Sequence, residues 1–169
     1  LLNGWQIEGR TMIPIVEDFV QRFGLKDYIV VADAGLMNKT NIALLESGNH
    51  KYILGARIKN ETDKMKKWIF SLKKQDGLFH ETRKANARLI IGYSEDRAKK
   101  DYYNREKGVM RLKAAYKNGT ITKDKINKRG YNKFLDLFDN VKVEINHSKI
   151  KEDEKWDGLK GYLTNTTLS

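Results

Sequence analysis

The 169-residue sequence contains no cysteine, a single proline and no hydrophobic run long enough to span a membrane. Without cysteine, the chain can form neither a disulfide framework nor a cysteine-ligated zinc or iron–sulfur site. The first residues also lack the basic-then-apolar order of a secretory signal. These absences predict a soluble, cytoplasmic protein with no membrane partner.

Acidic residues are fewer than basic ones. The sequence has 22 Asp and Glu and 33 Lys and Arg, which gives a net charge of +11 at pH 7. Residues 61–140 hold 21 basic and 11 acidic side chains, whereas residues 1–60 hold 7 and 6 and residues 141–169 hold 5 and 5. Solubility alone does not need such segregation. A phosphate backbone favours it, because each neutralised phosphate releases counterions. The charge therefore points to DNA or RNA, with simple solubility as the alternative.

Several common catalytic motifs are missing as well. The sequence has no GxGxxG, GxxxxGK[ST] or GxSxG motif, so the corresponding nucleotide sites and serine nucleophile are not predicted. His50, His80 and His147 do not have the spacing of paired zinc ligands, and no zinc site is expected.

The apolar pattern of the first segment predicts the order helix, strand, helix, strand. These elements are residues 11–23, 28–32, 39–47 and 52–56, and Asn38 is expected to cap the second helix. Pro14 falls in the first turn of the first helix, where a missing N–H costs little. The run at 28–32 is apolar on both faces, which is typical of a strand in the centre of a mixed sheet.

The middle segment is predicted to be mostly helical, with one hairpin. Residues 79–84 and 87–93 pair around Ala85-Asn86. We also expect a helix over 61–74, a long helix that Ser94 caps and that runs to about residue 117, short helices over 120–140 and closing strands over 141–145 and 161–163. The long helix has an apolar stripe formed by Ala98, Tyr102, Val109, Leu112 and Tyr116.

The other faces of the long helix are strongly basic. Its candidate DNA-binding residues are Arg97, Lys99, Lys100, Arg105, Lys107 and Arg111. These cations suit a DNA backbone. The alternative is a solvated face with intrahelical ion pairs, such as Asp101 with Arg105.

Asp33 is the sharpest candidate for chemistry. It follows a predicted strand, and catalytic groups of open sheets gather at the carboxyl ends of strands. A carboxylate there suits a hard cation such as Mg2+. The alternative is that Asp33 caps the following turn, a common role for an aspartate after a strand. A metal site would need further acids, and the candidates near the C-terminal end are Glu152, Asp153, Glu154 and Asp157. The alternative is that these acids form a solvated stretch before an Asp-Gly turn.

These blocks together resemble a known family. The run from Ile29 to Leu36, followed by a helix with Asn41, resembles the second-aspartate block of bacterial insertion-sequence DDE transposases. The segments 8–14, 52–57, 91–106 and 157–166 resemble, in the same order, the family segments around that block.

The resemblance implies a partial ribonuclease-H-like core at 1–60, a basic inserted region at 61–140 and a return to the core at 141–169. The resemblance also implies that Asp33 is a catalytic acid and Mg2+ ligand and that the partners are transposon ends and target DNA. It further implies a bacterial, nucleoid-associated protein whose complete enzyme is a homodimer. The family's other two acids would lie outside this chain, so we expect the fragment to be inactive alone.

Two other functions remain open. One is a non-catalytic DNA-binding module or domesticated remnant of a transposase. The other is a metal-dependent nuclease in which a tail acid such as Asp157 joins Asp33 at the metal.

Overall fold

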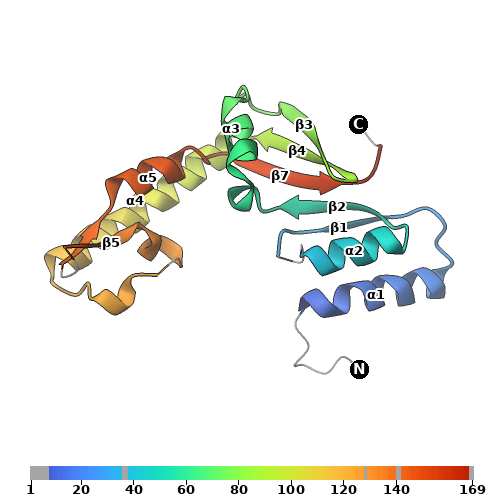
Figure 1. The fold of residues 1–169 in the computed structure, drawn as a ribbon, viewed down its shortest axis with the longest axis horizontal. Coiled ribbons are helices and arrows are strands. Elements are labelled where there is room, and N and C mark those ends of the chain that lie inside the picture. Colours follow the sequence, from blue (N-terminus) through green and yellow to red (C-terminus); the bar gives the residue numbers. More distant parts are fainter. Residues whose placement is uncertain (1–7, 36–37, 128, 140–141, 168–169) are drawn as a thin grey trace. The chain divides into compact units, whose positions relative to one another are not determined.

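The computed structural model describes residues 8–35, 38–127, 129–139 and 142–167. Within these ranges the chain forms five α-helices, a mixed five-stranded sheet and a two-stranded hairpin (Figure 1), so the predicted α/β class is confirmed. None of the helices in the described ranges combines the length and the apolar character needed to cross a membrane.

The chain divides into two compact units. The sheet unit comprises Leu1–Gly92 with Lys160–Ser169, and the helical unit comprises Tyr93–Leu159. These boundaries differ from the three predicted segments, since residues 61–92 join the sheet unit. The sheet unit holds 16 basic and 10 acidic residues and the helical unit 17 and 12, so the excess positive charge is shared almost evenly.

The five-stranded sheet has the order β1-β2-β7-β4-β3. Its strands are β1 (Ile29–Ala32), β2 (Lys51–Ala56), β3 (Phe79–Lys84), β4 (Ala87–Tyr93) and β7 (Leu159–Thr164). Strand β1 runs parallel to β2, β7 is antiparallel to β2, and β3 and β4 form the predicted hairpin. Ala85 in the hairpin turn has a φ of 53°, in the left-handed region that favours glycine.

The helices α1 (Glu8–Phe23) and α2 (Lys39–Ser47) pack against the sheet and share its core. Ile13 of α1 and Leu45 of α2 cluster with Tyr52, Leu54 and Leu163 of the sheet. Because side chains alternate across a strand, the neighbours of these sheet residues face the opposite side. A further helix, α3 (Asp63–Ser71), begins where the Thr62 hydroxyl accepts a hydrogen bond from the Met65 N–H.

Two expectations for this unit are wrong. The strand predicted for the sheet centre is β1, which lies at the edge of the described sheet and leaves Val31 73% exposed. The proline predicted for a first turn lies inside α1, because the helix already includes Glu8. Pro14 therefore removes one backbone hydrogen bond from the helix interior.

The helical unit is built on the long helix α4 (Glu95–Lys117), which the Ser94 side chain caps as predicted. The remaining elements are the short helices η2 (Lys123–Lys125) and η3 (Gly130–Phe134), the hairpin β5 (Leu135–Phe138) with β6 (Lys142–Ile145), and α5 (His147–Glu154). Their core comprises Val109, Leu112, Phe134, Leu135, Val143 and Ile150.

The sequence reasoning for residues 120–154 was partly wrong. Residues 135–138 form a strand instead of a helix, and Phe138 is 56% exposed. The helix α5 was not predicted, because its only buried apolar residue is Ile150 and the rest of its surface is charged or polar. Residue 141, the expected start of the next strand, lies outside the described ranges.

Candidate functional site

Asp33 stands directly after β1, at the carboxyl end of a strand paired in parallel with β2. Its Oδ1 accepts a hydrogen bond of 2.7 Å from the Gly35 N–H, which closes a local turn. The turn-capping role considered from the sequence is therefore present. The Asp33 side chain is exposed in this loop.

Residues at the end of β2 hold the Asp33 loop in place. Arg57 donates from Nε to the carbonyl of Ala34 at 2.8 Å and from Nη2 to the carbonyl of Gly35 at 3.2 Å. A Cβ at Gly55 would lie 2.7 Å from the Ala34 nitrogen, so only glycine permits this close approach. Sequence reasoning missed Arg57, although a basic residue just after the neighbouring strand was a usable signal.

The described residues do not fit a Mg2+ site. Nowhere in the described ranges do three or more His, Asp or Glu side chains come together as a metal ion would require. A two-metal phosphoryl-transfer site needs several converging acids, and Asp33 supplies one carboxylate at the end of β1.

The acids near the C-terminal end of the chain pair with basic residues of the helical unit. The two carboxylate oxygens of Asp157 lie 2.5 and 2.8 Å from Nη1 and Nη2 of Arg105. Asp153 is bonded to Lys133 at 2.8 Å, and Glu154 lies 3.9 Å from Arg105 Nε. The reading in which Asp157 completes a metal site with Asp33 loses its support, because both oxygens of Asp157 bind the guanidinium.

The assignment of Arg105 to the DNA-binding face is therefore wrong. Its side chain is only 3% exposed and lies on the buried face of α4 with Gly108, Val109 and Leu112. Burial acts to lower the pKa of the Arg105 guanidinium, but the hydrogen bonds and charge of Asp157 outweigh it and leave that pKa raised. The ion pair expected between Arg105 and Asp101 is not formed. Asp101 instead lies 3.6 Å from Arg97.

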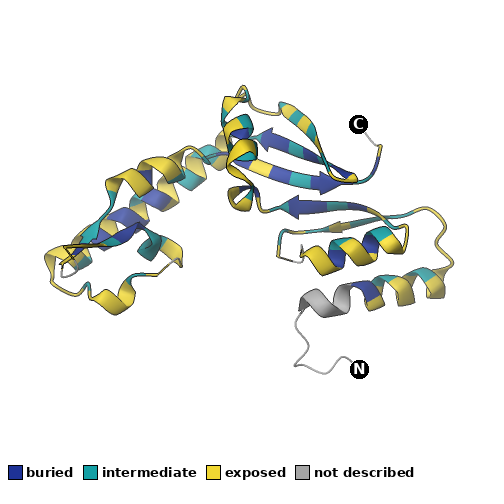
Figure 2. Ribbon diagram, in the orientation of Figure 1, coloured by how far each residue is buried: buried dark blue, intermediate teal, exposed yellow. Residues whose placement is uncertain are grey.

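The other predicted cations of α4 are all exposed. Figure 2 marks the exposed stretches of this helix in yellow among buried and half-buried ones. Lys99 lies 3.7 Å from Asp96, a loose pair in which both side chains are at least 75% exposed. Within the described part of the chain, Lys100, Lys107 and Arg111 have no carboxylate partner within ion-pair distance. At 100° per residue these three positions fall on one side of the helix, away from the centre of the buried face.

Aromatic and thioether side chains accompany these cations. Tyr103 is 63% exposed, and the Lys107 ammonium lies 5.9 Å from the centre of its ring. Met110 is 69% exposed. The predicted apolar stripe is wrong for Tyr102 and Tyr116, which are 57% and 40% exposed. The buried face runs instead through Arg105, because its pairing with Asp157 allows the charge to be buried.

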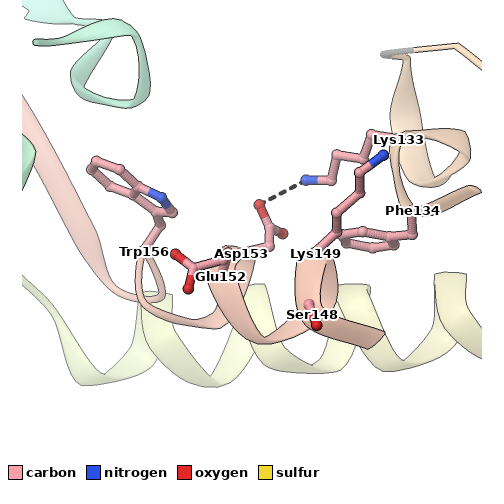
Figure 3. A pocket seen from close by; sticks show the side chains of 7 residues that line it. All are labelled: Lys133, Phe134, Ser148, Lys149, Glu152, Asp153 and Trp156. Atoms are coloured by element: carbon pink, nitrogen blue, oxygen red, sulfur yellow. Dashed lines mark hydrogen bonds and ion pairs between the residues drawn. The ribbon is translucent and has the colours of Figure 1, made fainter. Parts of the chain in front are cut away.

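A pocket of about 340 Å³ lies between α5 and η3 in the helical unit (Figure 3). It is lined by Lys133, Phe134, Ser148, Lys149, Glu152, Asp153 and Trp156. Lys133 is bonded to Asp153, and Lys149 is bonded to Asp136 beside the pocket. The paired charges make this pocket nearly neutral, so it does not select for an anion or a cation.

A larger groove of about 560 Å³ lies on the sheet unit, on the face that α1 and α2 leave open. Its lining combines apolar Ile53, Ile90 and Phe79 with the ion pair between Arg88 and Glu81, which is 2.6 Å long. The Arg88 guanidinium also donates to the carbonyl of Thr166 at 2.8 Å. These bonds fix the rim of the groove.

Comparisons with protein-family models, with curated proteins and with solved structures find no match to this chain. The class that the structure itself defines is an α/β protein with a small helical unit carrying a basic helix.

Proposed function

We propose that this chain is part of the catalytic region of a bacterial insertion-sequence DDE transposase, and that it binds DNA through one face of α4. The observation that carries the proposal is the row Lys100, Lys107 and Arg111 on one exposed side of α4, without carboxylate partners in the described ranges. An unneutralised row of cations on a rigid helix suits a phosphate backbone, because every contact releases condensed counterions.

The sheet unit would belong to a ribonuclease-H-like core. The parallel pair β1 and β2, with Asp33 at the carboxyl end of β1, supports this assignment. Asp33 would be one of the catalytic acids, and the complete enzyme would use Mg2+ on transposon ends and target DNA. The remaining acids would come from segments outside this chain, because no acid cluster forms within the described residues.

A non-catalytic DNA-binding module or domesticated transposase remnant is the second candidate function. The lack of an acid cluster in the described ranges favours it, whereas the held loop at Asp33 favours the first. Both functions predict DNA binding. Neither predicts Mg2+-dependent nicking of supercoiled DNA by this chain alone, so such nicking, abolished by Asp33→Asn, would overturn both.

The salt dependence of DNA affinity tests the shared part of the proposal. We expect the wild-type chain to bind a short duplex with a steep decrease in log K against log salt. The triple variant Lys100→Ala, Lys107→Ala, Arg111→Ala should flatten that slope by about 2 to 3, since each lost phosphate contact removes about 0.9.

A control variant that loses the same charge elsewhere in the unit tests whether the position of the charge matters. Lys142, Lys151 and Lys155 belong to the same unit and are exposed, but they lie on β6 and around α5. Replacing these three by alanine removes the same charge and should leave the slope within about 1 of the wild-type value. Equal slopes for the two triple variants would refute binding through this face of α4.

A further inference from the structure

Helix α1 has apolar side chains on two of its faces. Ile13 is 6% exposed and belongs to the core, with Val20 half-buried near the same side. On the outer side, Ile15, Phe19 and Phe23 are 47%, 54% and 58% exposed. The spacing of four residues aligns these three in one stripe, about 12 Å long at the helical rise of 1.5 Å per residue.

The outer stripe is more apolar than a solvent-facing helix surface normally is. The rings of Phe19 and Phe23 lie 4.5 Å apart and shield only part of each other. A helix that is apolar on two sides is typical of an element buried on both sides. Clustered large apolar side chains at a surface mark sites of protein association.

The charges beside the stripe indicate which partner fits it. Asp18 and Arg22 border one edge, each 67% exposed, and lie 3.2 Å apart on the helix. If a second α1 packs antiparallel about a two-fold axis near residue 20, Asp18 of each copy lies opposite Arg22 of the other. This border is therefore complementary to itself, whereas a polyanion on the stripe would meet the Asp18 carboxylate.

We propose that two copies of this chain associate in solution through the outer faces of their α1 helices, packed antiparallel. About half of each of the three apolar side chains is available, or roughly 300 Å² per copy if an aromatic residue can bury about 200 Å². Standard interfaces bury about 800 Å² per partner, so this smaller contact gives a weak dimer that forms only at high protein concentration. This inference does not depend on DNA binding.

Sedimentation of the DNA-free chain over a concentration series tests the surface. We expect a concentration-dependent dimer for the wild type and a monomer for Phe19→Glu at the same concentrations. Phe79→Glu is the matched control, since Phe79 is 62% exposed on β3 of the same unit but outside α1. It should dimerise like the wild type.

A charge exchange tests the antiparallel arrangement. Asp18→Arg and Arg22→Asp each place like charges opposite one another, so each variant alone should dimerise at least ten-fold more weakly. Mixing the two variants restores both opposite-charge pairs and should recover the wild-type dimer. Both positions are solvent-exposed, so both variants should fold, and circular dichroism checks this.

Three results would overturn the proposal. A wild-type chain that stays monomeric throughout excludes the dimer. Loss of the dimer in Phe79→Glu, with none in Phe19→Glu, would assign association to the open groove of the sheet unit. A mixture of the two charge variants that fails to dimerise would exclude the antiparallel arrangement. None of these results bears on the salt-dependent DNA binding proposed above.

Discussion

Replacing Arg105 by methionine should destabilise the helical unit far more than replacing an exposed cation of the same helix. The Arg105 side chain is 3% exposed, and both of its terminal nitrogens bind the Asp157 carboxylate, at 2.5 and 2.8 Å. The pair connects α4 to the turn before β7, where the Gly158 N–H also donates to Asp101 at 3.2 Å. Removal of the guanidinium leaves the Asp157 carboxylate uncompensated.

The magnitude follows from the burial of the two partners. Removing one partner of a fully buried pair costs about 3 to 5 kcal/mol. The Asp157 side chain keeps 19% exposure and can be partly hydrated, so we expect a loss of about 2 to 4 kcal/mol in the free energy of unfolding. The double variant Arg105→Met, Asp157→Asn should lose less than the sum of the single losses, with a coupling of about 1 to 3 kcal/mol.

Urea unfolding followed by tryptophan fluorescence is the assay, because Trp156 lies next to Asp157 in the helical unit. Arg111→Met is the control on the exposed side of α4 and should change the stability by no more than about 0.5 kcal/mol. A loss below about 1 kcal/mol for Arg105→Met, or an equal loss in the control, would refute the claim that the buried pair holds this unit together.

Three further predictions concern stability. Ala85→Gly should raise the free energy of unfolding of the sheet unit by about 0.5 to 1 kcal/mol, because Ala85 has a positive φ, and thermal denaturation would show no gain if the turn were unstrained. Asn165→Ala should lower the free energy of unfolding by about 1 to 3 kcal/mol, because the Asn165 side chain accepts a 2.9 Å hydrogen bond from the Tyr52 N–H. Hydrogen exchange at β2 should become faster in this variant, and unchanged exchange would contradict the prediction. The hydrogen bond from Lys149 lowers the pKa of Asp136 below its ordinary value of 3.8. The resulting stability is full above that pH and is lost as the pH falls through the lowered pKa. Asp136→Asn should flatten the acid limb of a stability–pH curve, and an unchanged limb would refute this assignment.

Local signals in the sequence predicted local structure well. Asn38 and Ser94 cap α2 and α4 as expected, since their side chains accept hydrogen bonds from backbone N–H groups three residues further on. The β3–β4 hairpin was predicted from two β-rich runs separated by two residues. In each case the information lies within a few residues of the element.

The errors arose where distant residues decide the outcome. Arg105 has helical spacing to Val109 and Leu112, which was a signal of burial, but its partner Asp157 lies 52 residues away and cannot be found from periodicity. The apolar run of β1 indicates a strand with two covered faces, whereas the described sheet ends at β1 and leaves Val31 exposed. Its place in the sheet depends on pairing that no local pattern encodes.

Lysine acetylation in the presence and absence of a DNA duplex tests the central claim most directly, because it reports which face of the helical unit meets DNA. The account predicts that bound duplex lowers the modification of Lys100 and Lys107 several-fold, while Lys151 and Lys155 are modified at the same rate with or without DNA. Equal protection of all four lysines, or protection confined to Lys151 and Lys155, would contradict DNA binding through α4.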